Sequence, residues 1–292
     1  MTHNRPILTD RHIRPPRIGC VSYLNAKPLI HGLAEAMPGC PLTLKPPAEL
    51  LQELEDGRCD LALCPVIDAQ RSALPLRIVP AGGIGCDGPT LTVRLFAGRP
   101  FDQVRRIRAD PESHTSVALL RCLWHARYGA APELAPLPLD HDPLAALQDD
   151  ADAVLLIGDK VVPQLDRVPQ DRQLDLGEAW KQETGLPFVF AVWVAREQAQ
   201  LGEVPEQLAG LLEVNLSRVD ALAKQYADQH GWPVLLAQRY LGALLRYRVG
   251  ERELQAIHRF YGLCKDAGVL SEVRPVATAV PTEHTQPPAK RA

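Results

Sequence analysis

Short apolar runs alternate with amphipathic helical patterns along the first part of the chain. Strands are predicted over residues 18–21, 41–45, 61–64 and 76–79, and helices over residues 29–36, 47–56 and 66–71. A β-α-β-α-β order of this kind is typical of a largely parallel sheet with right-handed crossover connections. The pattern therefore predicts an α/β unit at the start of the chain.

A second α/β unit follows, and the chain then becomes helical. The helix over 116–127 is well supported because Val117, Leu120, Leu123 and Trp124 fall on one face at helical spacing. Further strands are predicted over residues 91–97, 106–109, 153–157 and 186–196, a short helix over 143–148, a polar loop over 180–185, and helices over 205–226, 233–245 and 251–267.

The long strands over 91–97 and 186–196 bracket the second unit, so we interpret them as crossings between two lobes. We divide the chain into a first lobe of residues 17–96 plus 198–273, a second lobe of residues 97–197, and tails of residues 1–16 and 274–292 that we expect to be disordered. A cleft between lobes that two strands connect is a favoured small-molecule site and can close by hinge motion.

Composition narrows the class of protein. The chain has 292 residues, 46% of them apolar and 23% charged, with a formal net charge of -3, so we expect no nucleic-acid or membrane partner. The first residues lack the apolar core of a secretory signal. Seven cysteines without a CxxC pair fit a reducing cytoplasm and suggest neither disulfides nor a zinc site. The oligomeric state stays unknown at this point.

Two turns are candidates for holding an anion. Ser22 to Asn25 follow the first strand and precede a helix, which is where open α/β sheets bind ligands. Ser113, Thr115 and Ser116 stand at the predicted start of the helix over 116–127, where hydroxyls and free N–H groups can hold a carboxylate. From spacing alone, an ordinary βα turn and plain helix capping are the stronger interpretations.

Other motifs offer less chemistry. The glycine-rich stretch over 82–89 lacks the GxGxxG order and opens no helix, so a tight turn is predicted there. Asp87 and Asp159 are read first as turn and capping residues. The chain has no GxSxG, HExxH or P-loop signature. The residues by themselves thus predict a two-lobed α/β protein that binds a small anion, and leave its catalysis open.

Five segments carry a resemblance to a known family. They are VSYLNAKPLIHGL, GCDGPTLTVRLF, HTSVALL, DAVLLIGDKVV and TGLPFVFAVWVAR, and in this order they resemble the chorismate dehydratases of the futalosine route to menaquinone. The resemblance runs from about residue 17 to about residue 270. It implies a two-lobed fold like that of type II periplasmic binding proteins. It also implies a cytoplasmic hydro-lyase that converts chorismate to 3-[(1-carboxyvinyl)oxy]benzoate with no metal or organic cofactor.

The resemblance also implies which residues form the site. Asn25 and Thr92, the latter where the family commonly has Ser, are the expected catalytic residues. The expected substrate-binding residues are Ser22, Tyr23, Gly88, Ser113, Thr115, Ser116, Gly158 and Asp159. No side chain is an evident general base, with Lys27 the basic residue considered. We therefore hypothesise that the enolpyruvyl carboxylate of the substrate takes the C3 proton.

Two alternatives from other classes stay open. The same cleft can serve a cytosolic protein that binds or senses a small anion without catalysis. The sister enzyme that forms 1,4-dihydroxy-6-naphthoate has a similar fold, but its first turn usually has a Ser-Pro-Cys-Pro-Asn type of sequence. This chain has SYLN at that turn, which favours the dehydratase.

Overall fold

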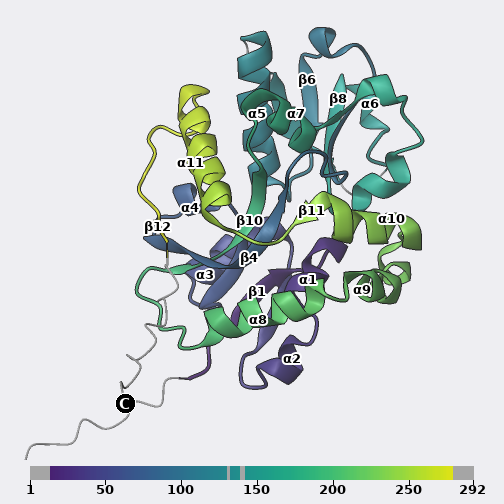
Figure 1. The fold of residues 1–292 in the computed structure, drawn as a ribbon. Coiled ribbons are helices and arrows are strands. Elements are labelled where there is room, and N and C mark those ends of the chain that lie inside the picture. The colour runs from purple at the N-terminus through teal and green to yellow at the C-terminus, as the bar shows by residue number, and fades with distance from the viewer. Residues whose placement is uncertain (1–13, 130–131, 139–141, 279–292) are drawn as a thin grey trace, which may run out of the picture.

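Two β-sheets divide the protein into two lobes (Figure 1). The computed structural model describes residues 14–129, 132–138 and 142–278. The first sheet has the strand order β11-β4-β10-β3-β1-β2, with β12 also paired to β4. Its strands are β1 (Ile18–Val21), β2 (Leu42–Lys45), β3 (Leu61–Pro65), β4 (Leu76–Cys86), β10 (Phe188–Arg196), β11 (Leu245–Arg246) and β12 (Ala277–Thr278).

The second sheet has the order β7-β6-β8-β5-β9. Its strands are β5 (Val93–Ala97), β6 (Arg106–Ala109), β7 (Glu133–Pro136), β8 (Ala153–Ile157) and β9 (Gln173–Asp175). The predicted α/β class with two lobes is therefore confirmed.

Both sheets are mixed, so the prediction of a largely parallel sheet is wrong in part. β1 pairs in parallel with β2 and β3, but β10 lies antiparallel between β3 and β4. The first eight residues of β10 are all buried, which suits a central strand covered on both faces. A strand that returns from the second lobe enters the sheet in the opposite direction, which the β-α-β pattern of the first unit does not reveal.

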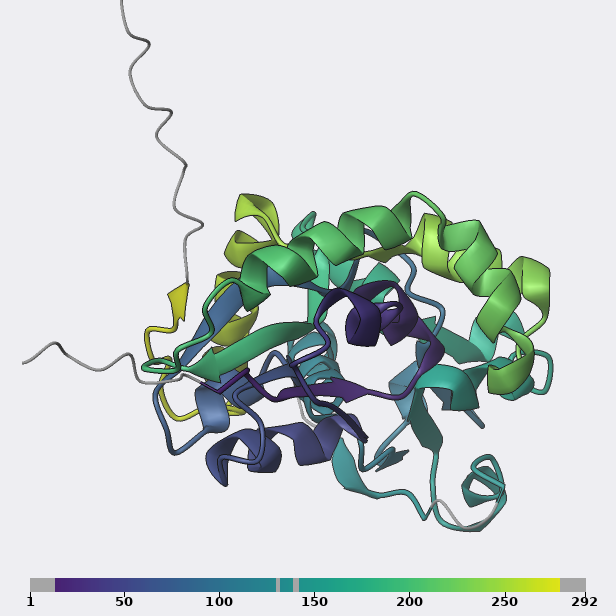
Figure 2. The same cartoon turned by 90° about the horizontal axis from the view of Figure 1, so that it is seen from below.

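Helices cover the sheets and form the C-terminal part of the described chain. They are α1 (Lys27–Ile30), α2 (Leu33–Ala36), α3 (Pro47–Glu55), α4 (Asp68–Arg71), α5 (His114–Tyr128), α6 (Ala146–Asp149), α7 (Leu176–Thr184), α8 (Val204–Leu216), α9 (Val219–Tyr226), α10 (Val234–Arg239) and α11 (Glu251–Asp266). A π-helix, Tyr240–Leu244, continues α10. Figure 2 shows α8 and the following helices, in green, along one side of the molecule, where α8 packs against α1 and β4.

Two predicted elements differ from the structure for identifiable reasons. The helix expected over 29–36 is divided into α1 and α2 because Gly32 has a φ of 79°. The polar loop expected over 180–185 is instead the end of α7. The N-terminus of α7 is capped by Asp175, whose carboxylate accepts hydrogen bonds from the backbone N–H groups of Gly177 and Glu178. The indole of Trp180 is fully buried, and its N–H donates to the carbonyl of Pro187.

The connections between the lobes lie beside the two long strands rather than within them. β5 belongs wholly to the second sheet and β10 wholly to the first. We therefore place the connections at residues 87–92 and 185–187, in contrast to the predicted boundaries at 96/97 and 197/198.

The inner ends of both predicted tails contact the first lobe. Arg14 forms an ion pair with Asp60, and β12 pairs with β4. Disorder is therefore not observed for residues 14–16 and 274–278, while residues 1–13 and 279–292 lie outside the described residues.

Residues 82–86 of the glycine-rich stretch form the second half of β4, so the prediction of a tight turn is wrong for this part, and residues 87–89 leave the strand. β4 continues through Cys86, paired with β10 on one side and with β11 on the other. A Cβ atom on Gly83 would lie 2.7 Å from the carbonyl oxygen of Ala191, and one on Gly85 would lie 2.6 Å from that of Phe188. The glycines are therefore required by close backbone approach rather than by a turn.

We expect Gly85→Ala to destabilise the protein by about 1–3 kcal/mol, because the new methyl group overlaps the backbone of β10. Gly262→Ala is the matched control. It lies within α11, its added Cβ meets no atom within 4 Å, and it should stabilise the protein by roughly 0.5–1 kcal/mol. Urea unfolding monitored by circular dichroism gives both values. An unchanged free energy of unfolding for Gly85→Ala would contradict the packing argument.

Candidate active site

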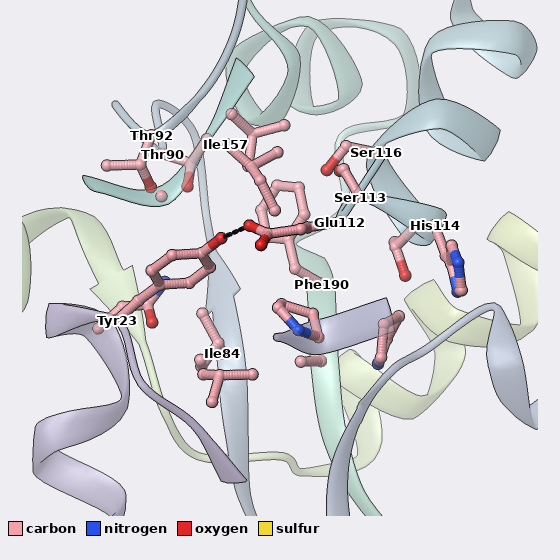
Figure 3. Close-up of a pocket in the computed structure, with 18 of the residues that line it drawn as sticks. Tyr23, Ile84, Thr90, Thr92, Glu112, Ser113, His114, Ser116, Ile157 and Phe190 are labelled. Carbon is pink, nitrogen blue, oxygen red and sulfur yellow. Dashed lines mark hydrogen bonds between the residues drawn. The ribbon is translucent and has the colours of Figure 1, made fainter. Parts of the chain in front are cut away.

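A cavity lies between the lobes and is lined by residues of both (Figure 3). Its residues surround about 550 Å³ of space, a volume that includes the solvent at the open mouth. The turn after β1 contributes Tyr23 and Asn25, and β10 contributes Phe190. The second lobe contributes the segment that enters β5 and the start of α5.

The hydroxyl of Tyr240 connects the two expected catalytic residues. The amide nitrogen of Asn25 donates to the Tyr240 hydroxyl oxygen at 3.2 Å. The same oxygen lies 2.6 Å from Oγ1 of Thr92. Burial raises the pKa of Tyr240 above its ordinary value, although the hydrogen bonds from Thr92 and Asn25 act in the opposite direction. The phenol is therefore neutral and keeps its proton at physiological pH.

The segment that carries Thr92 is held by a buried carboxylate. Asp175 accepts hydrogen bonds from the backbone N–H groups of Thr90 and Leu91, and it also pairs with Arg94. Leu91 has a φ of 68°, an uncommon conformation for a residue with a side chain. The carboxylate of Asp175 thus stabilises a strained turn and fixes the start of β5 at the wall of the cavity.

The carboxylate of Glu112 lines the cavity and connects the two lobes. The hydroxyl of Tyr23 donates to the carboxylate of Glu112 (Figure 3), and this carboxylate also accepts from the ammonium of Lys160. Lys160 also pairs with Asp110 at 2.8 Å. Burial raises the pKa of Glu112, but the hydrogen bonds from Lys160 and Tyr23 outweigh it, so the pKa is lowered. Glu112 is therefore an ionised group that joins the lobes.

The N-terminus of α5 lines the cavity and has hydrogen-bonding groups that are not used within the helix. Ser113 is the N-cap residue, yet its side chain makes no capping hydrogen bond. Its hydroxyl oxygen is buried and has no partner among the described residues. Thr115 is used differently, since its hydroxyl accepts from the backbone N–H of Ile67 at 3.4 Å. The first N–H groups of this 15-residue helix favour an anion.

The side chain of His114 borders the same region. Its Nδ1 lies 2.9 Å from the fully buried carboxylate of Asp68, which belongs to α4 of the first lobe. This pair, like the contact between Tyr23 and Glu112, joins the two lobes.

Most of the cavity wall is apolar, and its hydrogen-bond donors are neutral groups. Among the described residues that line it there is no Lys or Arg. Likewise, residues 14–129, 132–138 and 142–278 contain no group of three or more His, Cys, Asp or Glu side chains that suits a metal ion. No helix in this part of the chain is both long and apolar enough to cross a membrane. An anionic ligand would therefore rely on hydroxyls, amides and backbone N–H groups.

Residues 16–266 match the menaquinone biosynthesis family. The chain belongs to this family. It is 30% identical over 264 residues to a chorismate dehydratase from Thermus thermophilus, covering 85% of this chain and 94% of the relative.

Solved structures place the fold among the periplasmic binding proteins. The alkanesulfonate-binding protein SsuA from Xanthomonas axonopodis pv. citri is similar with a TM-score of 0.68 at 16% identity, covering 89% of this chain and 95% of that one. CA3427 from Candida albicans, described as having the generic periplasmic binding protein fold, has a TM-score of 0.64 at 12% identity, covering 89% and 92%. At these identities the likeness concerns the fold alone.

The structure brings most of the expected site residues of this family member together. Those that line the cavity are Tyr23, Asn25, Thr92, Ser113, Thr115, Ser116 and Gly158. Gly158 has a φ of 65° and lies against the Tyr23 ring, which a Cβ would approach to 3.1 Å. The close approach of the two lobes here thus requires glycine.

Three residues expected to bind substrate do not line the cavity. Ser22 is exposed, and Gly88 has a φ of 128° in the connection between the lobes. Asp159 accepts hydrogen bonds from Trp232 Nε1 at 2.9 Å and Leu24 N at 3.3 Å, and its Oδ2 lies 2.7 Å from His230 Nδ1. It therefore joins the second lobe to the first turn and the C-terminal helices, and we remove all three from the proposed site.

Sequence reasoning missed Tyr240, Glu112 and Phe190. Glu112 carried a signal, because it stands one residue before Ser113 in a turn already considered for ligand binding. Phe190 was visible only as part of an apolar strand. Tyr240 sits in a helical pattern far from the other motifs, so nothing in its neighbours indicates the cavity.

Glu112→Gln should lower the free energy of unfolding at pH 7 by about 1–2 kcal/mol, because Gln cannot pair with the Lys160 ammonium. The pKa of Glu112 lies below its ordinary value of 4.5 in the folded protein. Its stabilisation is therefore present above that value and lost as the pH falls through the lowered pKa. The stability difference between the two proteins should shrink correspondingly in urea titrations from pH 7 to pH 3.

The exposed Glu183→Gln is the control and should show no comparable pH-dependent difference. A difference between Glu112→Gln and the unmodified protein that stays constant down to pH 3 would contradict the assignment of Glu112 as an ionised link between the lobes.

Proposed function

We propose that the protein is a chorismate dehydratase that acts in menaquinone biosynthesis by the futalosine route. It removes water from chorismate and yields 3-[(1-carboxyvinyl)oxy]benzoate. The observation that carries the proposal is the meeting of Asn25, from the first lobe, and Thr92, from the segment that enters β5 of the second lobe, at one buried hydroxyl in the interlobe cavity. Membership of the family and the dehydratase relative support the same activity.

The reaction is an elimination within the substrate and requires no covalent bond to the protein. The C3–H bond breaks and its electron pair forms the C3=C4 bond, while the C4–O bond breaks with its pair on oxygen. That oxygen takes up one proton, equivalent to the proton released from C3, and leaves as water, and the ring becomes aromatic. The protein has to orient two carboxylates and stabilise the departing hydroxyl.

The N-terminus of α5 is our choice for one substrate carboxylate. Ser113 offers a buried hydroxyl without a hydrogen-bond partner among the described residues, and Ser116 lines the cavity one turn further along the helix. The positive end of the helix dipole adds to these donors. Asn25 and Thr92 then face the C4 hydroxyl.

The contacts of the nearby ionisable side chains limit which group can accept the C3 proton. Glu112 is paired with Lys160 and Tyr23, and its lowered pKa makes it a weak base. Lys27 does not line the cavity and lies over the ring of Tyr226, 5.1 Å from its centroid. We therefore retain the substrate's own enolpyruvyl carboxylate as the acceptor of the C3 proton.

Chorismate turnover tests the function. The purified protein should convert chorismate to a new aromatic benzoate, followed by absorbance and mass spectrometry, and Asn25→Ala should abolish the product. Gln198→Ala, an exposed residue outside the cavity, is the control and should leave the rate unchanged. Chorismate binding without product would favour a binding or sensor protein. Absence of both binding and product would refute the dehydratase.

His114→Asn tests the identity of the base. A histidine whose Nδ1 is bound by a buried carboxylate is an arrangement found in general bases, and Asn keeps a donor to Asp68. If the substrate supplies the base, kcat should fall by less than about tenfold, whereas loss of a general base costs about 10²–10⁴-fold. Lys27→Ala is the control. A fall beyond about 10²-fold in either variant, with chorismate binding intact, would overturn substrate assistance.

A further inference from the structure

Tyr240 occupies an unusual place in the protein. It begins the π-helix that follows α10, an element that is frequent at functional sites. Its ring stacks on the indole of Trp232, with centroids 4.7 Å apart and planes 17° from parallel. That indole donates to Asp159 of the second lobe. The ring of Tyr240 is thus held from outside the cavity, while its hydroxyl reaches the cavity wall.

The hydrogen atoms around this hydroxyl can be counted. The Asn25 amide nitrogen is a donor, so the Tyr240 oxygen accepts from it. The phenol has one hydrogen of its own, and Thr92 Oγ1 is the other partner recorded for it among the described residues. If Thr92 donated to Tyr240, the phenol hydrogen would be buried without an acceptor, which folded proteins avoid. Tyr240 therefore donates to Thr92.

We propose that Tyr240 is a positioning residue that sets the hydrogen-bond polarity of the site, so that Thr92 donates to the substrate and Asn25 accepts from it. Because Thr92 Oγ1 accepts the hydrogen bond from Tyr240, the hydroxyl hydrogen of Thr92 points toward the cavity. Asn25, held through its nitrogen, presents Oδ1, which is buried and has no partner in the described part of the chain. This inference rests on the proposed dehydration of chorismate.

The resulting pair matches the leaving group. A hydroxyl on C4 of the ring has one hydrogen to give and an oxygen to be stabilised. Asn25 Oδ1 accepts a hydrogen bond from this hydroxyl, and Thr92 donates a hydrogen bond to the hydroxyl oxygen as the C4–O bond lengthens. A hydrogen bond received from Tyr240 makes the Thr92 hydroxyl a better donor, because chained hydrogen bonds polarise one another. Tyr240 itself does not touch the substrate in this arrangement.

Tyr240→Phe tests the inference, because it removes the hydroxyl and keeps the ring on Trp232. For chorismate we expect kcat to fall by about 10- to 100-fold, the size found when a partner that orients a functional group is lost. KM should change little. Thr92→Val should show a comparable loss, and the loss in the double variant should be smaller than the product of the two single losses, because both changes interrupt the path from Tyr240 through Thr92. Thr92→Ser, which keeps the hydroxyl, should retain the dependence on Tyr240.

Tyr247→Phe is the matched control. Tyr247 is as buried as Tyr240, but its hydroxyl has no hydrogen-bond partner among the described residues. Its removal should leave kcat unchanged. Equal kcat values for Tyr240→Phe and the unmodified enzyme, or losses that multiply in the double variant, would overturn the inference while leaving the dehydratase activity established.

A neutron structure of the unliganded protein gives a test that does not depend on turnover. The deuterium between Tyr240 and Thr92 should sit on the tyrosine oxygen, with the threonine deuterium directed into the cavity. A deuterium on Thr92 directed at Tyr240 would overturn the inference even in an active enzyme. Failure of the unmodified protein to consume chorismate would refute the proposed function separately, and the deuterium position would still decide the polarity of the pair.

Discussion

The close pairing of β4 with β10 is the constraint on which the rest of the structure depends. β10 is the return strand from the second lobe, and it lies antiparallel at the centre of the first sheet. Glycines at 83 and 85 allow its backbone to approach β4. This pairing brings Phe190 and Ala191 of β10 and Ile84 of β4 to the cavity, and it sets where the chain passes between lobes. The site is therefore built on rigid strands, with its polar groups on the adjoining turns.

Contacts between polar side chains then hold the lobes around the cavity. Tyr23 reaches Glu112, His114 reaches Asp68, and Asp159 binds the first turn and Trp232. Each of these joins segments that are distant in sequence. In these contacts the charged side chains pair with one another or with protein donors. The groups that remain for the ligand are neutral donors and the N-terminus of α5. A dianionic substrate held by neutral groups keeps a carboxylate that is not quenched by a cation, which suits a carboxylate that has to act as a base.

The sequence was informative where local patterns reflect local causes. β1, β8 and α5 were predicted because apolar runs and helical spacing record their burial directly. The two-lobed class followed from the order of elements and from the family resemblance. Thr92 was named from that resemblance alone, whereas Asn25 already stood in a candidate ligand-binding turn and took its catalytic role from the resemblance.

The failures concern information that is not local. The glycines of β4 resemble a turn unless the backbone of β10 beside them is known. Asp159 resembles a loop carboxylate until the helices that donate to it are in place. Tyr240 gives no signal because its partners lie about 150 and 215 residues away. The start of α7 depends on Asp175, whose carboxylate serves both the helix and the turn at Leu91.

The central claim is that the reacting edge of the substrate lies against Asn25 and Thr92 while a carboxylate lies at the start of α5. A crystal structure with the aromatic product bound tests it most directly. We expect one product carboxylate within hydrogen-bond distance of Ser113, with the C4 edge of the ring facing Asn25 and Thr92. A product bound the other way round, or held by Lys160 outside this wall, would contradict it.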